Sequence, residues 1–503
     1  MADAAPAIRV RIAPSPTGPL HVGTARTALF NFLFARRNGG TFVLRMEDTD
    51  AVRSSIAYEK DILDGLHWLG LTWDEGPEVA GEEARGPYGS YLQMQRLPLY
   101  EAAALRLLDE DKAYPCYCTR EQLEEDRRRQ EAAHLPPRYV GRCANLTVAE
   151  RAAFEDEGRR PAIRFRIGEG IVAFDDLVRG HVEIDASALG GDLVIVRADG
   201  SPLYHFSVCV DDAAMKISHV IRGEDHLSNT PKHILLFRAL GEPVPLFGHL
   251  PLILNPDRSK MSKRALETGL GEYISEGFVR EAIVNFLALL GWSTGTEEEV
   301  LALDELVARF DIEHVQKGGA IFDRERLEWL NGQWIRRLPT PELVERLRPF
   351  LEAEKAAGRI DRVPSDEETV AVVPLVQERP PTLGAIGDLV GFLYTERLEF
   401  EPALLVPKRW DAAMTLDGLA AARAMIADNG ELSFDHEGLE TALRGLADSR
   451  GWKAGDLFMA IRVAVTGRTA TPPLFETLVA LGYRRTLERI DRALEVLADD
   501  TAA

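Results

Sequence analysis

Apolar and charged residues alternate near the start of the chain, in the segment IRVRI (8–12). This alternation predicts a β-strand. A turn rich in Pro and Gly follows, and apolar residues between 25 and 33 then recur at helical spacing until Gly39-Gly40. The segment TFVLRME (41–47) predicts a second strand. Strand, turn, helix and strand together form a βαβ unit, which predicts a parallel sheet.

The pattern changes after the first hundred residues. Residues from about 95 to 203 predict an insert with an acidic–basic helical run, three cysteines and a strand pair near 162–196. Strand patterns return in LYHFSVCV (203–210) and HVIR (219–222), so the first fold resumes there. From about 266 to the end the pattern is helical, with breaks at prolines.

The composition is that of an ordinary globular protein. Of the 503 residues, 46% are hydrophobic and 28% charged, which excludes disordered, collagen-like and membrane classes. No stretch is long and apolar enough to predict a membrane span, and the start MADAAPAIRV lacks the features of a signal peptide. We therefore expect a cytoplasmic protein without a membrane partner.

The net charge of −21 argues against a nucleic-acid partner, because phosphate binding uses Lys and Arg. The charge is unevenly distributed, however. Residues 451–503 hold seven basic and seven acidic residues, so this end of the chain is neutral. Net charge describes solubility more than any local site, so a specific motif outweighs it.

Two segments carry candidate phosphate chemistry. In RIAPSPTGPLHVGT (11–24), a strand passes into a helix through a turn that places His21 and Gly23 at the helix N-terminus, where backbone N–H groups favour an anion. In NPDRSKMSKR (255–264), Lys260 and Lys263 form a cation pair for a polyphosphate. Taken singly, each segment also fits a solvent-exposed turn.

Together, HVGT (21–24) and KMSK (260–263) resemble the two signature motifs of class I aminoacyl-tRNA synthetases. RMEDTD (45–50) and HVIRGEDHLSNTPKH (219–233) narrow the resemblance to bacterial glutamyl-tRNA synthetases. Thr24 stands where the first motif usually ends in His, a variation common among glutamyl enzymes. The resemblance implies an α/β fold: a Rossmann-type class I catalytic domain split by an insert, followed by an all-helical anticodon-binding half.

The resemblance also implies the division of the chain. The expected segments are a first Rossmann half, an inserted acceptor-binding domain with the cysteine cluster, a second Rossmann half, a stem-contact domain and two helical anticodon-binding domains: 1–94, 95–203, 204–265, 266–338, 339–406 and 407–503.

The implied activity is ligation of L-glutamate to tRNA(Glu), with ATP as the energy source and Mg²⁺ as its ion. The residues implied to bind glutamate are Arg11, Ala13, Ser15, Glu47, Tyr204 and Arg222. Those implied to bind ATP are Pro14, His21, Gly23, Asp225, Ile253, Lys260 and Lys263. The catalytic set is His21, Gly23, Thr24, Lys260 and Lys263, and Arg379 is the candidate that reads the anticodon.

The residue chemistry agrees with this substrate. Glutamate carries two carboxylates and one ammonium, so its pocket needs two cations and an anion. The resemblance assigns the side-chain carboxylate to Arg11, the α-ammonium to Glu47 and a further contact to Arg222. Arginine suits carboxylates, since its planar fork pairs with both oxygens and stays protonated.

A cysteine cluster stands in the predicted insert. Cys116, Cys118 and Cys143 have the spacing of the zinc ligands in zinc-bearing members, but Asn145 occupies the place of the fourth ligand, a histidine. A structural zinc site is four-coordinate, so three thiolates alone predict a site holding well under one zinc per chain. His134 is a candidate substitute that the sequence does not place.

Several alternatives stay open. A glutaminyl-tRNA synthetase shares the catalytic fold, although a neutral amide substrate would not call for Arg11 and the helical C-terminal half differs from the β-barrels of that family. A nucleotidylyltransferase or a non-catalytic tRNA-binding paralogue would retain part of the motifs. The sequence also leaves open whether tRNA(Gln) is a second substrate, and a monomer is only what the resemblance implies.

Overall fold

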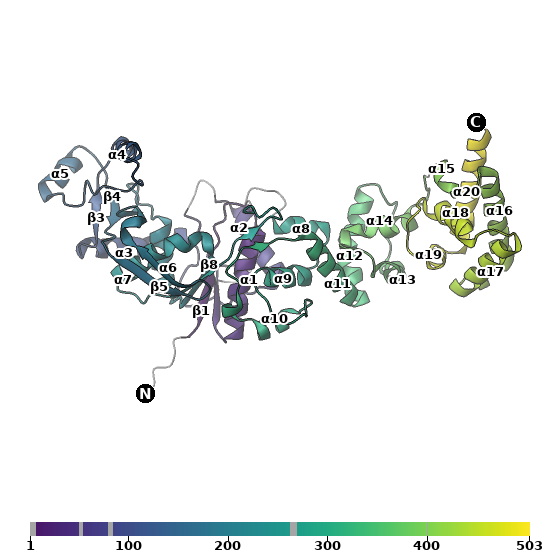
Figure 1. Cartoon of the computed structure of the whole chain (residues 1–503), viewed down its shortest axis with the longest axis horizontal. Coiled ribbons are helices and arrows are strands. Elements are labelled where there is room, and N and C mark those ends of the chain that lie inside the picture. The colour runs from purple at the N-terminus through teal and green to yellow at the C-terminus, as the bar shows by residue number, and fades with distance from the viewer. Residues whose placement is uncertain (1–6, 50–53, 79–83, 262–268, 400, 503) are drawn as a thin grey trace. The chain divides into compact units, whose positions relative to one another are not determined.

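A computed structural model describes residues 7–49, 54–78, 84–261, 269–399 and 401–502 of the chain (Figure 1). The chain forms two compact units. The N-terminal unit comprises Met1–Glu272 and Ile283–Arg324, and the C-terminal unit comprises Tyr273–Ala282 and Glu325–Ala503. The six-part division expected from the sequence stays a prediction.

The N-terminal unit begins with the predicted βαβ unit. Strand β1 (Arg9–Ile12), helix α1 (Val22–Arg37) and strand β2 (Thr41–Leu44) follow one another, and the two strands pair in parallel. The regular strand ends at Leu44, before the predicted end at 47. The backbone nevertheless continues alongside β1, because the Arg45 and Glu47 amides donate to the carbonyls of Ile12 and Pro14.

A second sheet has the order β6-β5-β9-β8. Its strands are β5 (Ile171–Asp176), β6 (Gly180–Asp185), β8 (His219–Gly223) and β9 (Leu246–Leu250). Strand β8, predicted from HVIR, runs parallel to β9. It also lies beside β1, where the amide of Ser218 donates to the carbonyl of Arg9 over 3.0 Å. The ends of β1 and β8 are thereby brought together.

The predicted insert has a sheet of its own. Strands β3 (Ala113–Cys116), β4 (Ala162–Phe165) and β7 (Leu193–Val196) pair antiparallel, which confirms the strand pair expected near 162–196. Two helices accompany this sheet, α4 (Arg120–Ala132) and α5 (Val148–Asp156). Each begins at a threonine that forms a capping box with the residue three positions later.

The strand predicted over 203–210 is wrong, because these residues begin helix α6 (Tyr204–Ala214). Tyr204, Phe206 and Val208 alternate with other positions, but the apolar residues also satisfy helical spacing, and such short runs are ambiguous. Packing decides the outcome. Phe206 and Val208 are buried in a core shared with Val220 of β8 and Phe247 of β9.

The remaining helices and strands of the first 323 residues follow in chain order: α2 (Ile56–Trp68), α3 (Leu97–Asp109), α7 (Thr230–Ala239), β10 (Ile253–Leu254), α8 (Leu270–Glu276), α9 (Arg280–Leu289), α10 (Leu303–Arg309) and β11 (Ala320–Ile321). The short strands β10 and β11 pair in parallel. Within the described residues, none of the helices combines the length and apolarity needed to cross a membrane.

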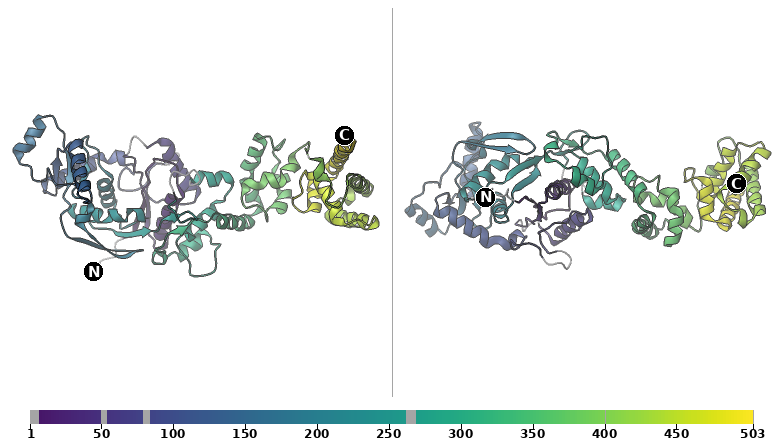
Figure 2. Two further views of the ribbon diagram at one scale, coloured as in Figure 1. Left: turned by 45° about the horizontal axis from the view of Figure 1, so that its top comes forward. Right: turned by 90° about the horizontal axis from the view of Figure 1, so that it is seen from below.

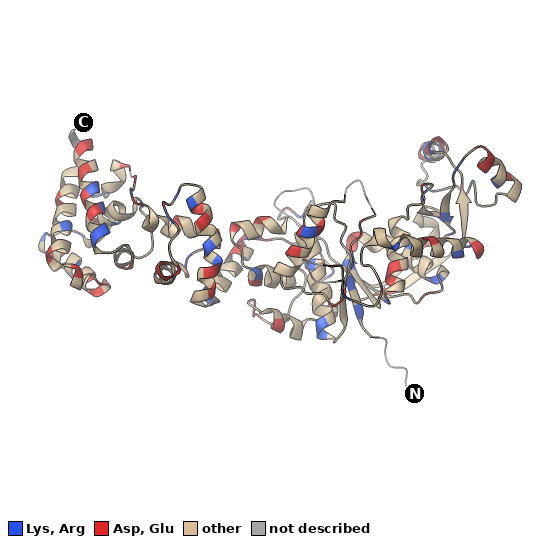
Figure 3. Cartoon of the chain, turned by 180° about the vertical axis from the view of Figure 1, so that it is seen from behind, with Lys and Arg blue, Asp and Glu red and all other residues tan. Residues whose placement is uncertain are grey.

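The C-terminal unit is helical, as the sequence predicts (Figure 2). Its helices are α11 (Arg324–Arg337), α12 (Thr340–Ala356), α13 (Asp366–Val376), α14 (Ile386–Val390), α15 (Pro402–Leu405), α16 (Ala412–Asn429), α17 (His436–Ser449), α18 (Ala454–Thr466), α19 (Leu474–Leu481) and α20 (Tyr483–Ala502). Acidic and basic residues are interspersed along the helices of both units (Figure 3). Leu419, Ile461 and Ile490 form part of a fully buried core.

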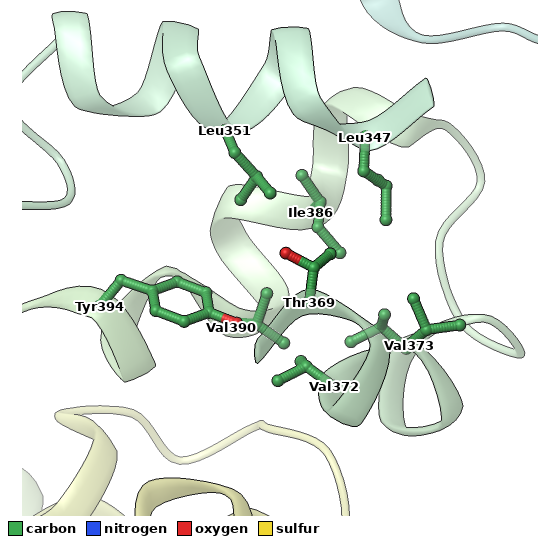
Figure 4. A pocket seen from close by; sticks show the side chains of 9 residues that line it. Leu347, Leu351, Thr369, Val372, Val373, Ile386, Val390 and Tyr394 are labelled. Atoms are coloured by element: carbon green, nitrogen blue, oxygen red, sulfur yellow. The ribbon is translucent and has the colours of Figure 1, made fainter. Parts of the chain in front are cut away.

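A small cavity lies among α12, α13 and α14 (Figure 4). Its lining comprises Leu347, Leu351, Thr369, Val372, Val373, Val376, Ile386, Val390 and Tyr394. The volume of about 10 Å³ is at the lower limit for one water molecule. This cavity is therefore a packing defect rather than a substrate site.

An ion pair in the C-terminal unit predicts a pH-dependent stability. Arg346 donates from two nitrogens to Glu281, each over 2.7 Å. Burial alone would raise the pKa of Glu281, but this pair lowers it to about 2, against 4.5 for an ordinary glutamate. A depressed carboxylate pKa stabilises the folded state above pH 4.5, and the contribution disappears as the pH falls towards 2.

We expect Glu281→Gln to lower the free energy of unfolding by ~1–2 kcal/mol at pH 6, because Arg346 loses its charged partner. The difference from the wild type should shrink steadily as the pH falls below 4.5. Urea denaturation of the full chain between pH 7 and pH 3 measures this, with the exposed Glu345→Gln as the control. A difference that stays constant across this range would contradict the assignment.

Candidate functional site

The turn between β1 and α1 is built around His21. The imidazole caps α1, since its Nδ1 accepts a hydrogen bond from the Gly23 amide over 2.9 Å. A Cβ on residue 23 would lie 3.1 Å from that nitrogen, so glycine leaves room for the cap. Asp61 accepts from the Leu20 amide over 2.6 Å and holds the turn from the side. The N-terminus of α1 thus has the geometry of an anion site.

Lys260 of the second motif lies beside β10, and the chain after the motif returns to the turn before α1. Lys260 pairs with Leu254 at the end of β10, and its Nζ lies 3.7 Å from a carboxylate oxygen of Asp225. Gly269 then forms a backbone bridge with His21, and the Leu270 amide donates to the Leu20 carbonyl over 2.8 Å. Lys263 lies outside the described residues.

A buried ionic cluster lies beneath the turn. Arg45 is fully buried and donates to Asp212 over 2.7 Å, while the Nε of Arg11 donates to both oxygens of Asp212, over 3.2 and 3.3 Å. Burial would raise the pKa of Asp212, but the two arginines hold it below its ordinary value. Asp211, the neighbouring residue, accepts from Arg96 over 2.6 Å.

Glu47 lies at the edge of this cluster. It is 7% exposed and accepts from Arg45 over 3.2 Å. Burial raises the pKa of Glu47, with Arg45 and Arg11 acting in the opposite direction. A cation beside this carboxylate would remove part of the cost of its burial.

Arg222, at the end of β8, has neutral hydrogen-bond partners, whereas Arg11 and Arg45 pair with carboxylates. It is 5% exposed and donates to His249 Nε2 (3.2 Å), His233 Nδ1 (3.1 Å), Thr230 Oγ1 (2.7 Å) and the His226 carbonyl (3.3 Å). All four partners are neutral groups. Among the residues that the structure describes, no carboxylate forms an ion pair with Arg222. A buried charge without a paired counter-charge is costly, so Arg222 is a candidate to bind an anion.

Tyr204 faces the same region. Its hydroxyl lies 3.2 Å from Nδ1 of His226. Burial raises the pKa of Tyr204 to about 12, and the charges of Arg222, Glu47 and Arg11 all act on it. That Arg11, Glu47, Tyr204 and Arg222 line one pocket stays a prediction from the resemblance. Pro14 and Ser15 lie in the turn above β1, Pro14 buried and Ser15 exposed.

The cysteine cluster is compact. The sulfurs of Cys116, Cys118 and Cys143 lie within 4.8 Å of one another, with 3.6 Å between those of Cys118 and Cys143. The hydroxyl of Tyr139 is 3.5 Å from the first sulfur and 3.6 Å from the second. Asn145 and His134 are exposed and do not belong to the cluster.

These spacings fit a tetrahedral zinc site. Zinc binds thiolates at ~2.3 Å and oxygen at ~2.0–2.2 Å, so the edges of its tetrahedron are about 3.5–3.8 Å long. The 3.6 Å between the sulfurs of Cys118 and Cys143, and the 3.5 and 3.6 Å from the Tyr139 hydroxyl to Cys116 and Cys118, match this value, and Tyr139 would be the fourth donor. The Cys143 amide donates to the Tyr139 oxygen over 3.0 Å, and Arg164 donates to the Cys116 sulfur over 3.2 Å. Both contacts would stabilise negatively charged ligands.

Sequence reasoning missed four of these residues. Asp211 and Asp212 directly follow the strand predicted over 203–210, where acidic residues are expected in an exposed loop rather than in a buried cluster. The available signal was the arginine content of the neighbouring strands, since buried arginines need counter-charges. Tyr139 was overlooked because tyrosine is an uncommon ligand, and His249 because it lies far along the chain from Arg222.

Comparison with known proteins assigns the family. Residues 7–329 match the family described as class I tRNA synthetases (E and Q), catalytic domain. The chain belongs to this family. Residues 342–494 match an anticodon binding domain.

The relatives match along almost the whole length of this synthetase. A glutamate–tRNA ligase of Moorella thermoacetica is 44% identical over 98% of this chain and 99% of its own length. One of Heliobacterium modesticaldum is 45% identical, over 97% of each chain. The crystal structure of a glutamate tRNA ligase from Elizabethkingia meningosepticum, in complex with its amino acid, matches with a TM-score of 0.86 at 32% identity, over 97% of this chain and 99% of that one.

Arg379 lies within the anticodon-binding match. It is exposed, and its guanidinium donates to the Thr471 carbonyl over 3.1 Å. Arg462 donates to Thr471 Oγ1 over 2.6 Å, and both burial and the charge of Arg379 lower the pKa of Arg462. Two arginines therefore converge on one loop of this synthetase.

The ionic cluster predicts the effect of removing its central cation. We expect Arg45→Met to lower the stability of the synthetase by ~3–5 kcal/mol, because Asp211 and Asp212 would retain buried charges with fewer partners. Arg37→Met, at an exposed position, is the control for the loss of one positive charge. Thermal and urea unfolding measure both variants. Equal stability of the two would show that the cluster is not a buried ionic unit.

Proposed function

We propose that the chain is a glutamate–tRNA ligase. It activates L-glutamate with ATP to glutamyl-adenylate and transfers the glutamyl group to the 3′-terminal ribose of tRNA(Glu). The observation that carries the proposal is the buried Arg222, whose hydrogen-bond partners among the described residues are all neutral groups. The full-length similarity to glutamate–tRNA ligases supports it.

The pocket divides the charges of glutamate. Arg11 pairs with the side-chain carboxylate, Glu47 accepts from the α-ammonium, and Arg222 supplies the second cation. Tyr204 closes the wall with a hydroxyl, and Ala13 and Ser15 form the rim. Glutamine carries no side-chain charge, so Arg11 would meet a neutral amide where glutamate offers a second carboxylate beside Asp212. The rival glutaminyl activity is not favoured for this reason.

ATP lies on the turn formed by His21, Gly23 and Thr24. Pro14, Asp225 and Ile253 bound the nucleoside, while Lys260 and Lys263 contact the phosphates. The α-carboxylate of glutamate attacks the α-phosphate, forming a P–O bond, and pyrophosphate leaves. No general base is required, since the nucleophile is already an anion. The protein positions the two reactants and stabilises the developing charge. Mg²⁺ bound to ATP supplies further neutralisation.

The C-terminal unit supplies the tRNA contacts. Its match to an anticodon binding domain supports this role, and Arg379 is the proposed anticodon-reading residue. Residues 451–503 balance seven basic with seven acidic residues, so the net charge of −21 does not come from this end of the chain. The monomeric state and the cytoplasmic location stay predictions.

Charging assays test the activity. We expect the purified protein to attach radiolabelled glutamate, and not glutamine, to tRNA(Glu), and a parallel reaction shows whether tRNA(Gln) is also charged. Arg222→Gln should raise the KM for glutamate by ~10²-fold, because a buried charge pair with the substrate is lost. Arg238→Gln, at an exposed position on α7, serves as the control. Charging with glutamine, or an unchanged KM in Arg222→Gln, would refute the proposed pocket.

The lysines of the second motif are tested separately. Lys260→Ala and Lys263→Ala should each slow glutamate activation by ~10²–10³-fold, as expected when a donor to developing phosphate charge is removed. The Kd for tRNA should change far less. ATP–pyrophosphate exchange and filter binding give the two values, and the exposed Lys216→Ala is the control. Equal losses in activation and tRNA affinity would argue against a role at the phosphates.

We also propose that zinc is held by Cys116, Cys118, Cys143 and Tyr139. Bound zinc would cross-link β3 to the segment before α5 and fix this part of the insert. The role is structural, because a site with four protein ligands leaves no open position for substrate. The sequence does not predict an occupied site, because Asn145 stands where zinc-bearing members have a histidine. Tyr139 would supply the fourth ligand instead.

Metal analysis tests the site. We expect about one zinc per chain after dialysis of the wild type, as for a closed four-ligand site. Tyr139→Phe should lose most of it. Tyr117→Phe is the matched control, because its hydroxyl donates to Glu155 away from the sulfurs. Well under one zinc per chain in the wild type would contradict this four-ligand site and agree with the prediction made from the three cysteines alone.

A further inference from the structure

We propose that Asp176 is a positioning residue for substrate binding: it fixes the tautomer of His249, which in turn orients Arg222. The proposal rests on the glutamate pocket described above and extends it to residues on two neighbouring strands. Arg222 lies on β8, His249 on β9 and Asp176 at the end of β5, and these strands are adjacent in one sheet.

Asp176 is 4% exposed, and its two oxygens have different partners. Oδ1 accepts from the amides of Val178 (3.0 Å), Arg179 (2.8 Å) and His249 (3.2 Å). Oδ2 lies 2.5 Å from Nδ1 of the His249 ring. Burial opposes ionisation, but these hydrogen bonds hold the pKa of Asp176 below its ordinary value. An ionised carboxylate only accepts, so Nδ1 of His249 carries the proton.

The opposite nitrogen of His249 is then an acceptor. Burial lowers the pKa of His249, so the ring is neutral and Nε2 has a free lone pair. Arg222 donates to this nitrogen from Nε over 3.2 Å, and Thr230 Oγ1 lies 3.0 Å from it. The Thr230 hydroxyl accepts from Arg222 over 2.7 Å, and its own proton has two acceptors within reach, Nε2 of His249 and the carbonyl of His226 at 3.5 Å.

His233 repeats this arrangement on the other side of the guanidinium. Its Nδ1 lies 3.1 Å from a terminal nitrogen of Arg222, and its Nε2 lies 3.0 Å from Nδ1 of His205. Burial lowers the pKa of both histidines, that of His205 to about 4. Arg222 is thus oriented by neutral acceptors that do not neutralise its charge. The charge stays available for a substrate carboxylate.

The substitution Asp176→Asn should reverse the tautomer. Three backbone amides point at the Oδ1 position, so the amide oxygen of the substituted side chain has to occupy that place. Its NH₂ group then faces Nδ1 of His249, which becomes an acceptor. Nε2 consequently carries the proton and meets the Nε–H of Arg222, donor against donor. The guanidinium has to move, although the volume of the side chain at position 176 is nearly unchanged.

Steady-state aminoacylation tests this. We expect Asp176→Asn to raise the KM for glutamate by ~10–100-fold, because substitutions that misorient a ligand-binding side chain through its hydrogen-bond partner have effects of this size. The KM for ATP should be nearly unchanged. Asp175→Asn is the matched control, because Asp175 is the preceding residue of β5 and its side chain is exposed. If Asp176→Asn raised the KM for ATP as much as the KM for glutamate, the substitution would disturb the whole active site, and the proposal would be overturned.

A double-mutant cycle separates the relay from a merely structural role. In an His249→Ala background, Asp176→Asn should change the KM for glutamate less than ~2-fold, because the aspartate acts through the imidazole. Additive effects would contradict the proposal. If the wild type charges tRNA with glutamate but Asp176→Asn behaves like Asp175→Asn, the relay alone is refuted. If the wild type does not charge tRNA with glutamate, the proposed function itself is wrong.

The tautomer of His249 can also be measured directly in the unmutated protein. In ¹⁵N-histidine NMR spectra, with the His249 signals assigned by their absence from His249→Ala, the wild type should show a protonated Nδ1 and an unprotonated Nε2. A protonated Nε2 in the wild type would overturn the proposal.

Discussion

The N-terminal unit depends on the charge balance around Arg45. This guanidinium is fully buried and contacts Asp212, Asp211 and Glu47, which come from α6 and from the chain after β2. Arg11 joins the cluster from β1. Buried charges are costly unless paired, so the strands and helix that carry them have to assemble together. Arg11 and Glu47 therefore have fixed positions in the wall of the proposed glutamate pocket.

The sequence predicted the parts of this site that have a local signal. The βαβ unit follows from alternation in 8–12 and helical spacing after His21, and β8 follows from HVIR. Arg11, Glu47, Tyr204 and Arg222 came from the family resemblance, and the structure holds Arg11 and Glu47 in one ionic cluster. Periodicity failed at 203–210, because a short apolar run satisfies both strand and helix spacing and only packing against β8 and β9 distinguishes them.

The partners of these residues could not be predicted in the same way. Asp176 and His249 are 73 positions apart and meet only because β5 and β9 are neighbours in the sheet. Tyr139 reaches the cysteine sulfurs from a loop that has no periodic pattern. In both cases the sequence indicates the residue that bears the chemistry, whereas tertiary structure determines which side chain completes it.

Strand β5 joins the predicted insert to the sheet that contains β8 and β9. Residues 171–185 lie within the predicted insert, yet β5 is paired with β9 of the catalytic sheet, and Val172 is buried with Val220 and Phe247 in one core. The insert is therefore not a detachable module with two clean junctions. Any ancestral or engineered enzyme without it would need another strand to cover the edge of β9 and another acid beside His249. Loss of the insert would thus remove the partner of His249 beside the proposed amino-acid pocket, as well as the segment expected to bind the tRNA acceptor end.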